Sequence, residues 1–157
     1  ELTGLQKVCV RVGDTIARLG PGGCAAVGFG LGLLAMPALP SVTLPLITAG
    51  MGYLTGWDAK GAKDAFEAGP GSQAWEKRRE SSFGPPRSVT TADAGSHFIT
   101  GAVAVAGMLI GGALTGYSPV GMVLGLIPAF GAAIVTGRAA GQAERALITH
   151  RWGAEHV

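Results

Sequence analysis

The stretch that decides the fold runs from residue 97 to residue 137 and reads HFITGAVAVAGMLIGGALTGYSPVGMVLGLIPAFGAAIVTG. It lies in an interval, between Asp93 and Arg138, that contains no Asp, Glu, Lys or Arg. An interval of about 40 residues is roughly 60 Å long as continuous helix, whereas one bilayer crossing takes about 20 residues. The interval is therefore sized for two membrane crossings.

A second uncharged interval of similar size lies between Arg18 and Asp58. Across the 157 residues only 14% are charged and 48% are hydrophobic, too little charge for an ordinary soluble domain. The composition therefore predicts an all-α integral membrane protein. The net charge of +2 is small and the cations are scattered, so we expect no nucleic-acid partner.

Prolines and glycines mark where each uncharged interval turns back. The first interval breaks at Met36-Pro37-Ala38-Leu39-Pro40-Ser41 and the second at Gly116-Tyr117-Ser118-Pro119. These breaks predict four transmembrane helices, as two glycine-rich helical hairpins, over residues 22–37, 41–57, 97–116 and 119–137. The alternative is that each interval forms one long tilted helix or a re-entrant loop. Pro45 and Pro128 fall inside the return helices, where we expect mild kinks.

The predicted organisation has five parts: an amphipathic N-terminal helix over residues 1–20, a first transmembrane hairpin over 21–57, a charged inter-hairpin loop over 58–96, a second transmembrane hairpin over 97–137, and a C-terminal helix and tail over 138–157. Gly20-Pro21 ends the first helix. We expect this helix to lie along the membrane interface or against a partner. Its predicted apolar face consists of Leu2, Leu5, Val8, Val12, Ile16 and Leu19.

The inter-hairpin loop has breaks at Gly69-Pro70-Gly71 and Gly84-Pro85-Pro86, with a short helix predicted over residues 74–80. Such a segment cannot build a core of its own, so it is either disordered or draped on something else. Because it contains Trp75 and Phe83, we expect a partner subunit to cover it.

The basic residues predict the topology. All Lys and Arg residues lie in the N-terminal, central and C-terminal polar segments, and neither turn contains one. With four crossings these segments share one side, which the positive-inside tendency assigns to the cytoplasm or to the matrix of an organelle. We therefore predict a multi-pass protein of a bacterial or organellar inner membrane. Trp57 and Tyr117 are expected at opposite headgroup layers.

The two halves suggest a tandem repeat. Without gaps, Thr55-Gly56 aligns with Thr136-Gly137, and Gly30 then pairs with Gly111. Beyond the membrane, Ala59, Ala62 and Ala65 meet Ala140, Ala143 and Ala146. Both copies would enter the membrane from the same side.

Small residues recur one helical turn apart in the predicted spans. In lipid, where helices are not driven together by the hydrophobic effect, such grooves allow close backbone contact. The sequence leaves open whether the contacts are internal or between subunits. The predicted helix-packing residues are Gly28, Gly32, Gly52, Gly56, Gly107, Gly111, Gly112, Gly116, Gly121 and Gly125.

Residues needed for membrane chemistry are missing from the predicted spans. None contains a carboxylate, Lys or Arg, which proton relays and ion sites require. Asp93-x-x-x-His97 has helical spacing and is interpreted as a helix cap, and Cys9 and Cys24 as free thiols. We therefore expect no enzymatic activity, cofactor or metal.

The expected function is that of a small non-catalytic structural or assembly subunit of a multi-subunit membrane complex. Its partners would be other membrane subunits and lipids, contacted through the glycine-rich faces. The alternative is a homo-oligomeric pore-forming, pilin-like or secretion-system membrane subunit.

Overall fold

The computed structural model describes residues 1–36, 41–80 and 84–157, and all regular structure in these residues is helical. The all-α prediction is confirmed. The elements are α1 (Gly4–Ala35), α2 (Leu44–Ala68), α3 (Gln73–Arg79), α4 (Ala92–Leu114), α5 (Pro119–Leu124) and α6 (Ile127–Trp152), followed by a 3₁₀ turn, Ala154–His156.

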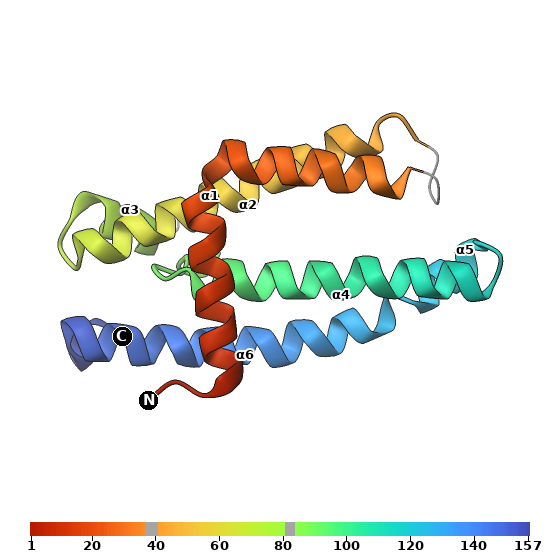
Figure 1. Ribbon diagram of the computed structural model, residues 1–157. Helices are drawn as coiled ribbons and strands as arrows, with labels where there is room; N and C mark the ends of the chain where they lie inside the picture. Colours follow the sequence, from red (N-terminus) through yellow and green to blue (C-terminus); the bar gives the residue numbers. More distant parts are fainter. Residues whose placement is uncertain (37–40, 81–83) are drawn as a thin grey trace.

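The helices form two antiparallel pairs that run side by side (Figure 1). The second half of α1 pairs with α2, and α4 pairs with α5 and α6. Residues 115–118 turn the second pair at the far right of the view, whereas α3 and the C-terminus lie at the opposite end. We call these the turn end and the loop end. The two helical pairs thus point in the same direction.

A kink divides α1 in two. Gly20 has φ 69° and ψ −179°, and Pro21 follows it inside the helix. Proline cannot continue the hydrogen-bond ladder, and glycine accepts the positive φ at no steric cost. Residues 4–19, the N-terminal segment, therefore cross the helices steeply, level with the start of α4 and on its loop-end side (Figure 1). The predicted break at Gly20-Pro21 lies at this change of direction.

Three helical regions are long and apolar enough to cross a membrane: Gly4–Ala35, Ala92–Leu114 and Pro119–Trp152, of which the last takes in α5 and α6. They indicate a membrane protein. The helix α2 is not among them, because charged residues begin at Asp58 and leave about 14 apolar residues, roughly 21 Å of helix. One crossing of hydrocarbon takes about 30 Å.

Two predicted kinks are wrong. Pro45 lies in the first turn of α2 and Pro128 in the first turn of α6. Neither ring interrupts a helix there, because the first turn has no intrahelical partner for the missing N–H. The return path of the second pair is instead broken between Leu124 and Ile127, where α5 ends and α6 begins.

The expectation that a partner covers Trp75 is also wrong. Its side chain is 4% exposed and packs with Ala65, Val89 and Ile148, so the loop lies on α2 and α6 of the same chain. Ser72 caps α3 by accepting a hydrogen bond from the Trp75 backbone N–H. Phe83 and the predicted turn at Pro37 and Pro40 lie outside the described residues.

The buried face of the N-terminal segment differs from the predicted apolar face. Of the predicted residues only Ile16 is buried, whereas Val8 is 46% exposed and Leu19 50%. The face that packs on α4 and α6 consists of small or polar residues, because the backbones approach too closely there for large side chains. It includes Gln6, Cys9, Gly13 and Ala17.

The large apolar side chains lie mainly on the outside. Of the 27 exposed among the described residues, 24 lie in residues 27–57 and 98–135. The three clusters of buried apolar residues, by contrast, contain none from 25–58 or 97–138 and lie at the loop end. Most of their members are alanines and cysteines. Large side chains outside and small ones inside are typical of a protein surrounded by hydrocarbon.

Candidate functional site

The first hairpin closes through four of the predicted glycines. A Cβ on Gly56 would lie 2.6 Å from the Gly20 carbonyl oxygen, closer than real side chains come. A Cβ on Gly52 would overlap the carbonyl of Cys24 in the same way. The contacts are Gly28 with Thr48, Gly32 with Pro45 and Thr48, Gly52 with Cys24, and Gly56 with Gly20 and Cys24.

The second hairpin has a shorter seam of the same kind. Gly107 faces Gly125 and Gly111 faces Gly121, so that each glycine meets the backbone of the other helix. A Cβ on Gly112 would come within 2.9 Å of the Tyr117 ring. All these contacts are made within one hairpin. The described structure therefore uses these glycines internally.

Gly116 has a different place. Its φ is 62° and that of Tyr117 is 59°, and a Cβ on Gly116 would meet nothing within 4 Å. The residue forms the turn between α4 and α5, where a positive φ favours glycine. It is the one predicted packing glycine without a close neighbour in the described residues.

A glycine crossing at the loop end was missed from the sequence. Gly13 on the N-terminal segment lies against the backbone of Thr91, with the Thr91 carbonyl carbon 2.5 Å from an added Cβ. Gly95 on α4 lies against the carbonyl of Cys9. Neither glycine belongs to a Gly-x-x-x-Gly pair, so the motif gave no signal. The small residues Cys9 and Gly13, one helical turn apart on the N-terminal segment, could have indicated this close crossing.

Hydroxyl and amide groups join α6 to its neighbours just inside the loop end. The Thr136 hydroxyl donates to the Ala132 carbonyl at 2.6 Å and lies 3.3 Å from the Thr100 and 3.4 Å from the Ser96 hydroxyl. Gln6 Nε2 donates to Gln142 Oε1 at 2.9 Å. These bonds satisfy the buried polar side chains of Gln6, Ser96 and Thr136.

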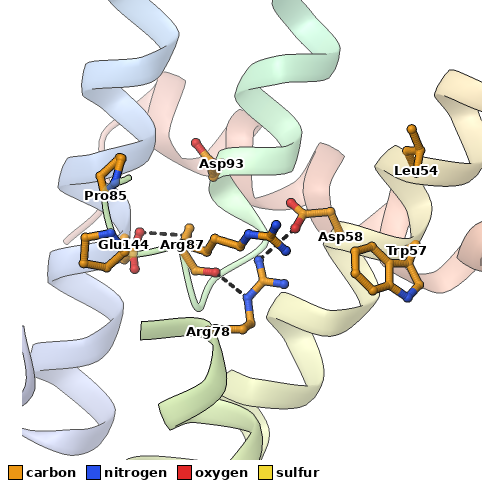
Figure 2. Close-up of a pocket in the computed structure, with 10 residues that line it drawn as sticks. Leu54, Trp57, Asp58, Arg78, Pro85, Arg87, Asp93 and Glu144 are labelled. Atoms are coloured by element: carbon orange, nitrogen blue, oxygen red, sulfur yellow. Dashed lines mark hydrogen bonds and ion pairs between the residues drawn. The ribbon is translucent and has the colours of Figure 1, made fainter. Parts of the chain in front are cut away.

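An ion pair and a cavity of about 610 Å³ lie where the loop meets both hairpins (Figure 2). Arg78, 12% exposed, donates from Nη2 to Asp58 Oδ1 at 3.1 Å and from Nε to the Ser88 carbonyl at 2.8 Å. Arg87 lines the same cavity. Arg78 thereby ties the middle of α2 to the segment that leads into α4.

Glu144 on α6 holds the other side of the loop. Its carboxylate accepts from the Ser88 hydroxyl at 2.7 Å and from the Val89 N–H at 3.2 Å, and Arg79 lies 3.8 Å away. With these donors the carboxylate is occupied by the chain itself. It serves to fix the loop.

Asp93 and Asp14 both act at the start of α4. Asp93 lies in the first turn of α4, 3.6 Å from His97, while the N-cap residue is Thr91. Asp14 accepts a hydrogen bond from the Thr91 hydroxyl at 2.6 Å instead of pairing with Arg18. Acidic side chains near a helix N-terminus are stabilising. Asp14 thus also fastens the N-terminal segment to α4.

The remaining titratable groups offer little chemistry. Cys9 and Cys24 are free and buried, with thiols directed at the backbone carbonyls of Thr136 and Ile16. A hydrogen bond from exposed Lys60 to Asp64 raises the pKa of the lysine. Within residues 1–36, 41–80 and 84–157 no group of three His, Cys, Asp or Glu side chains is placed to hold a metal.

Comparison with known proteins adds no relative. No protein-family model matches the chain, and neither the curated proteins nor the solved structures give a significant match. The chain is therefore described by its physical class, an all-helical protein with three helices apolar enough to cross a membrane.

Proposed function

We propose that this chain crosses the membrane four times, as two hairpins, and serves as a small non-catalytic structural subunit of a multi-subunit membrane complex. The observation behind the proposal is the outward surface of the hairpins. It consists largely of exposed apolar side chains, which need lipid or neighbouring apolar helices around them. The partners would be other membrane subunits and lipids.

In the part of the chain that the structure describes, the buried apolar clusters that join the two hairpins lie at the loop end. The buried clusters that link them involve residues of the N-terminal segment, the loop, and the polar ends of α2, α4 and α6. Between the loop end and the turn end, each hairpin can therefore offer an apolar face to a neighbour. This leaves two apolar faces on one small subunit, which suits a part that holds larger subunits together.

The glycines between the two helices of each hairpin already contact the partner helix. Contacts with neighbouring subunits would therefore involve the outward glycines. Gly30, Gly50 and Gly131 have nothing within 4 Å of an added Cβ. They lie among exposed Leu, Ile, Val and Met side chains. Such small residues let a neighbouring helix approach closely.

The apolar part of α2 is shorter than the hydrocarbon layer, and a four-crossing arrangement has to accommodate this difference. Either the bilayer thins near the charged end of α2, or the flanking Lys60 extends its side chain to the headgroups. The loop, the C-terminus and the N-terminal segment lie at the same end of the hairpins (Figure 1). Under the positive-inside tendency that end would face the cytoplasm or the matrix of an organelle.

A tandem repeat is part of this proposal, and it has mixed support. Ala59 and Ala62 are buried, as are their counterparts Ala140 and Ala143. In contrast, Gly30 faces open space while its counterpart Gly111 lies inside a seam. Ala65 is buried but its counterpart Ala146 is exposed. The repeat would thus be preserved only in part of the polar extensions of α2 and α6 and lost in the membrane seams.

Gentle detergent extraction from the native membrane, followed by native mass spectrometry, tests the proposal. Several different proteins bound to the chain would support it. A ring or ladder of this chain alone would favour the homo-oligomeric pore or pilin-like subunit, and a lone monomer would contradict both.

Matched substitutions identify the surface involved. Gly131→Leu enlarges an outward glycine and should release the partners while the subunit still folds. Gly111→Leu enlarges an inward glycine and should unfold the second hairpin itself. If Gly30→Leu, Gly50→Leu and Gly131→Leu together leave the complex intact, the outward glycines are not its contacts.

A further inference from the structure

We infer that the N-terminal segment, residues 4–19, lies in the plane of the membrane surface and binds the anionic headgroups of phospholipids. This inference rests on the proposed membrane-spanning arrangement and adds a ligand to it. Its basis is the division of the helix surface into three strips, each with a different neighbour.

One strip is buried against the hairpins. Cys9 and Gly13 meet the backbone of α4, and Cys9 also packs with Ala139 and Ala140 of α6. Because the segment crosses the hairpins steeply, it runs parallel to the bilayer if they span it (Figure 1).

A second strip is cationic. Lys7, Arg11 and Arg18 are all exposed, and a helical repeat of about 100° per residue places them within about 40° of one another. In the described residues no carboxylate lies within ion-pair distance of any of the three. Their charge is left for a ligand outside the chain.

A third strip is apolar and lies about 100° around the helix from the cations. It contains Val8 and Leu19, 46% and 50% exposed, together with half-buried Val12. An apolar strip and a cationic strip side by side are typical of a helix at the boundary between headgroups and acyl chains.

The order of the strips matches the direction of the membrane. Asp14, next to the cationic strip, reaches Thr91 just before α4 begins, so this side of the helix faces the loop end. Gly95 lies one turn farther into α4, and it contacts Cys9. Cys9 is on the side of the N-terminal segment nearer the apolar strip. The apolar strip thus faces the hairpins and the cations face away from them.

Three acidic side chains at the same end already have partners within the chain. Asp58 pairs with Arg78, Asp64 with Lys60, and Glu144 with the loop. Arg138 adds an exposed cation at the same level, since the next two residues of α6 pack on Cys9. The result is a layer of unmatched positive charge at the depth of the headgroups, complementary to lipid phosphate.

The test uses the whole purified chain in nanodiscs with equal parts phosphatidylcholine and phosphatidylglycerol. Native mass spectrometry of the released protein gives the ratio of anionic to neutral lipid that stays bound. Arg11→Gln/Arg18→Gln should lower this ratio about fivefold per cation removed, following the effect of a basic residue near an anionic surface. Lys77→Gln/Arg145→Gln removes the same charge from exposed sites elsewhere and should change the ratio less than twofold.

Salt provides a second arm. At 1 M ionic strength the screening length falls to about 3 Å, and the preference of the wild type for anionic lipid should shrink toward that of the Arg11→Gln/Arg18→Gln variant. Equal ratios in both double variants would overturn the inference. Failure of the wild type to float with carbonate-washed vesicles would instead refute the membrane-spanning proposal, so the two failures are distinguishable.

Discussion

Gly50 and Gly52 lie two residues apart on α2 and allow the helix seam to be tested with a matched pair. An added Cβ at Gly50 meets nothing within 4 Å. At Gly52 it overlaps the Cys24 carbonyl oxygen, with the carbonyl carbon at 2.8 Å and the Ala25 nitrogen at 3.3 Å. Both positions are helical, so alanine alters the intrinsic helix preference equally at both.

The expected magnitude follows from two terms. Replacing glycine with alanine inside a helix is worth about 1 kcal/mol in either variant. Only Gly52→Ala forces the backbones of α1 and α2 apart, and overpacking of this kind costs about 1–3 kcal/mol. The difference in unfolding free energy between the two variants should therefore be about 1–3 kcal/mol, with Gly52→Ala the less stable.

The assay is unfolding in mixed micelles by titration with sodium dodecyl sulfate, followed by far-ultraviolet circular dichroism. Because the comparison is between two variants of the same composition, effects on the detergent-unfolded state cancel to a good approximation. Equal stabilities, or a greater loss in Gly50→Ala, would refute the tight seam between α1 and α2.

Further predictions concern the loop end and the thiols. Gly69 and Gly71 both have φ 81°, but only Gly69 would bring a Cβ to 2.7 Å from the Trp152 ring, so Gly69→Ala should lower the unfolding free energy by about 1–3 kcal/mol more than Gly71→Ala; equal losses would contradict the contact. Arg78→Gln should cost about 1–3 kcal/mol in the same titration, whereas Lys60→Gln, which removes an exposed pair, should leave the stability nearly unchanged; the reverse order would count against the contact between Arg78 and the loop. Cys9 and Cys24, 0% and 8% exposed, should react with a maleimide only after denaturation, and rapid labelling of the native protein would show that the N-terminal segment does not pack as described.

The features predicted correctly from the sequence are those that depend on local composition alone. The absence of charge between Asp93 and Arg138 predicted apolar helices there, and this interval contributes to two of the three helical regions apolar enough to cross a membrane. Gly20-Pro21 predicted a break because neither residue suits a continuous helix, and the kink lies there. These signals are local, so they survive without knowledge of the tertiary structure.

The errors have a common origin in tertiary contacts. Hydrophobic periodicity predicted one apolar face that contains Val8, Ile16 and Leu19. Close crossing at Gly13 selects small residues for the buried face and leaves Val8 and Leu19 exposed. Trp75 was expected to need a partner because its cover, Ile148, lies far along the chain. The glycine pairs indicated close packing, but only the coordinates show which helix each one faces.

The most direct test of the whole account asks whether the middle of each hairpin lies in hydrocarbon. Single cysteines replace outward side chains there, at Leu31, Met51, Val105 and Phe130, with Lys77→Cys as the water-exposed control. In intact vesicles a membrane-impermeant maleimide should label Lys77→Cys from the exposed side and leave the other four unlabelled until detergent is added. Labelling of all four at the rate of the control would show that water surrounds the hairpins, and the membrane-spanning account would be wrong.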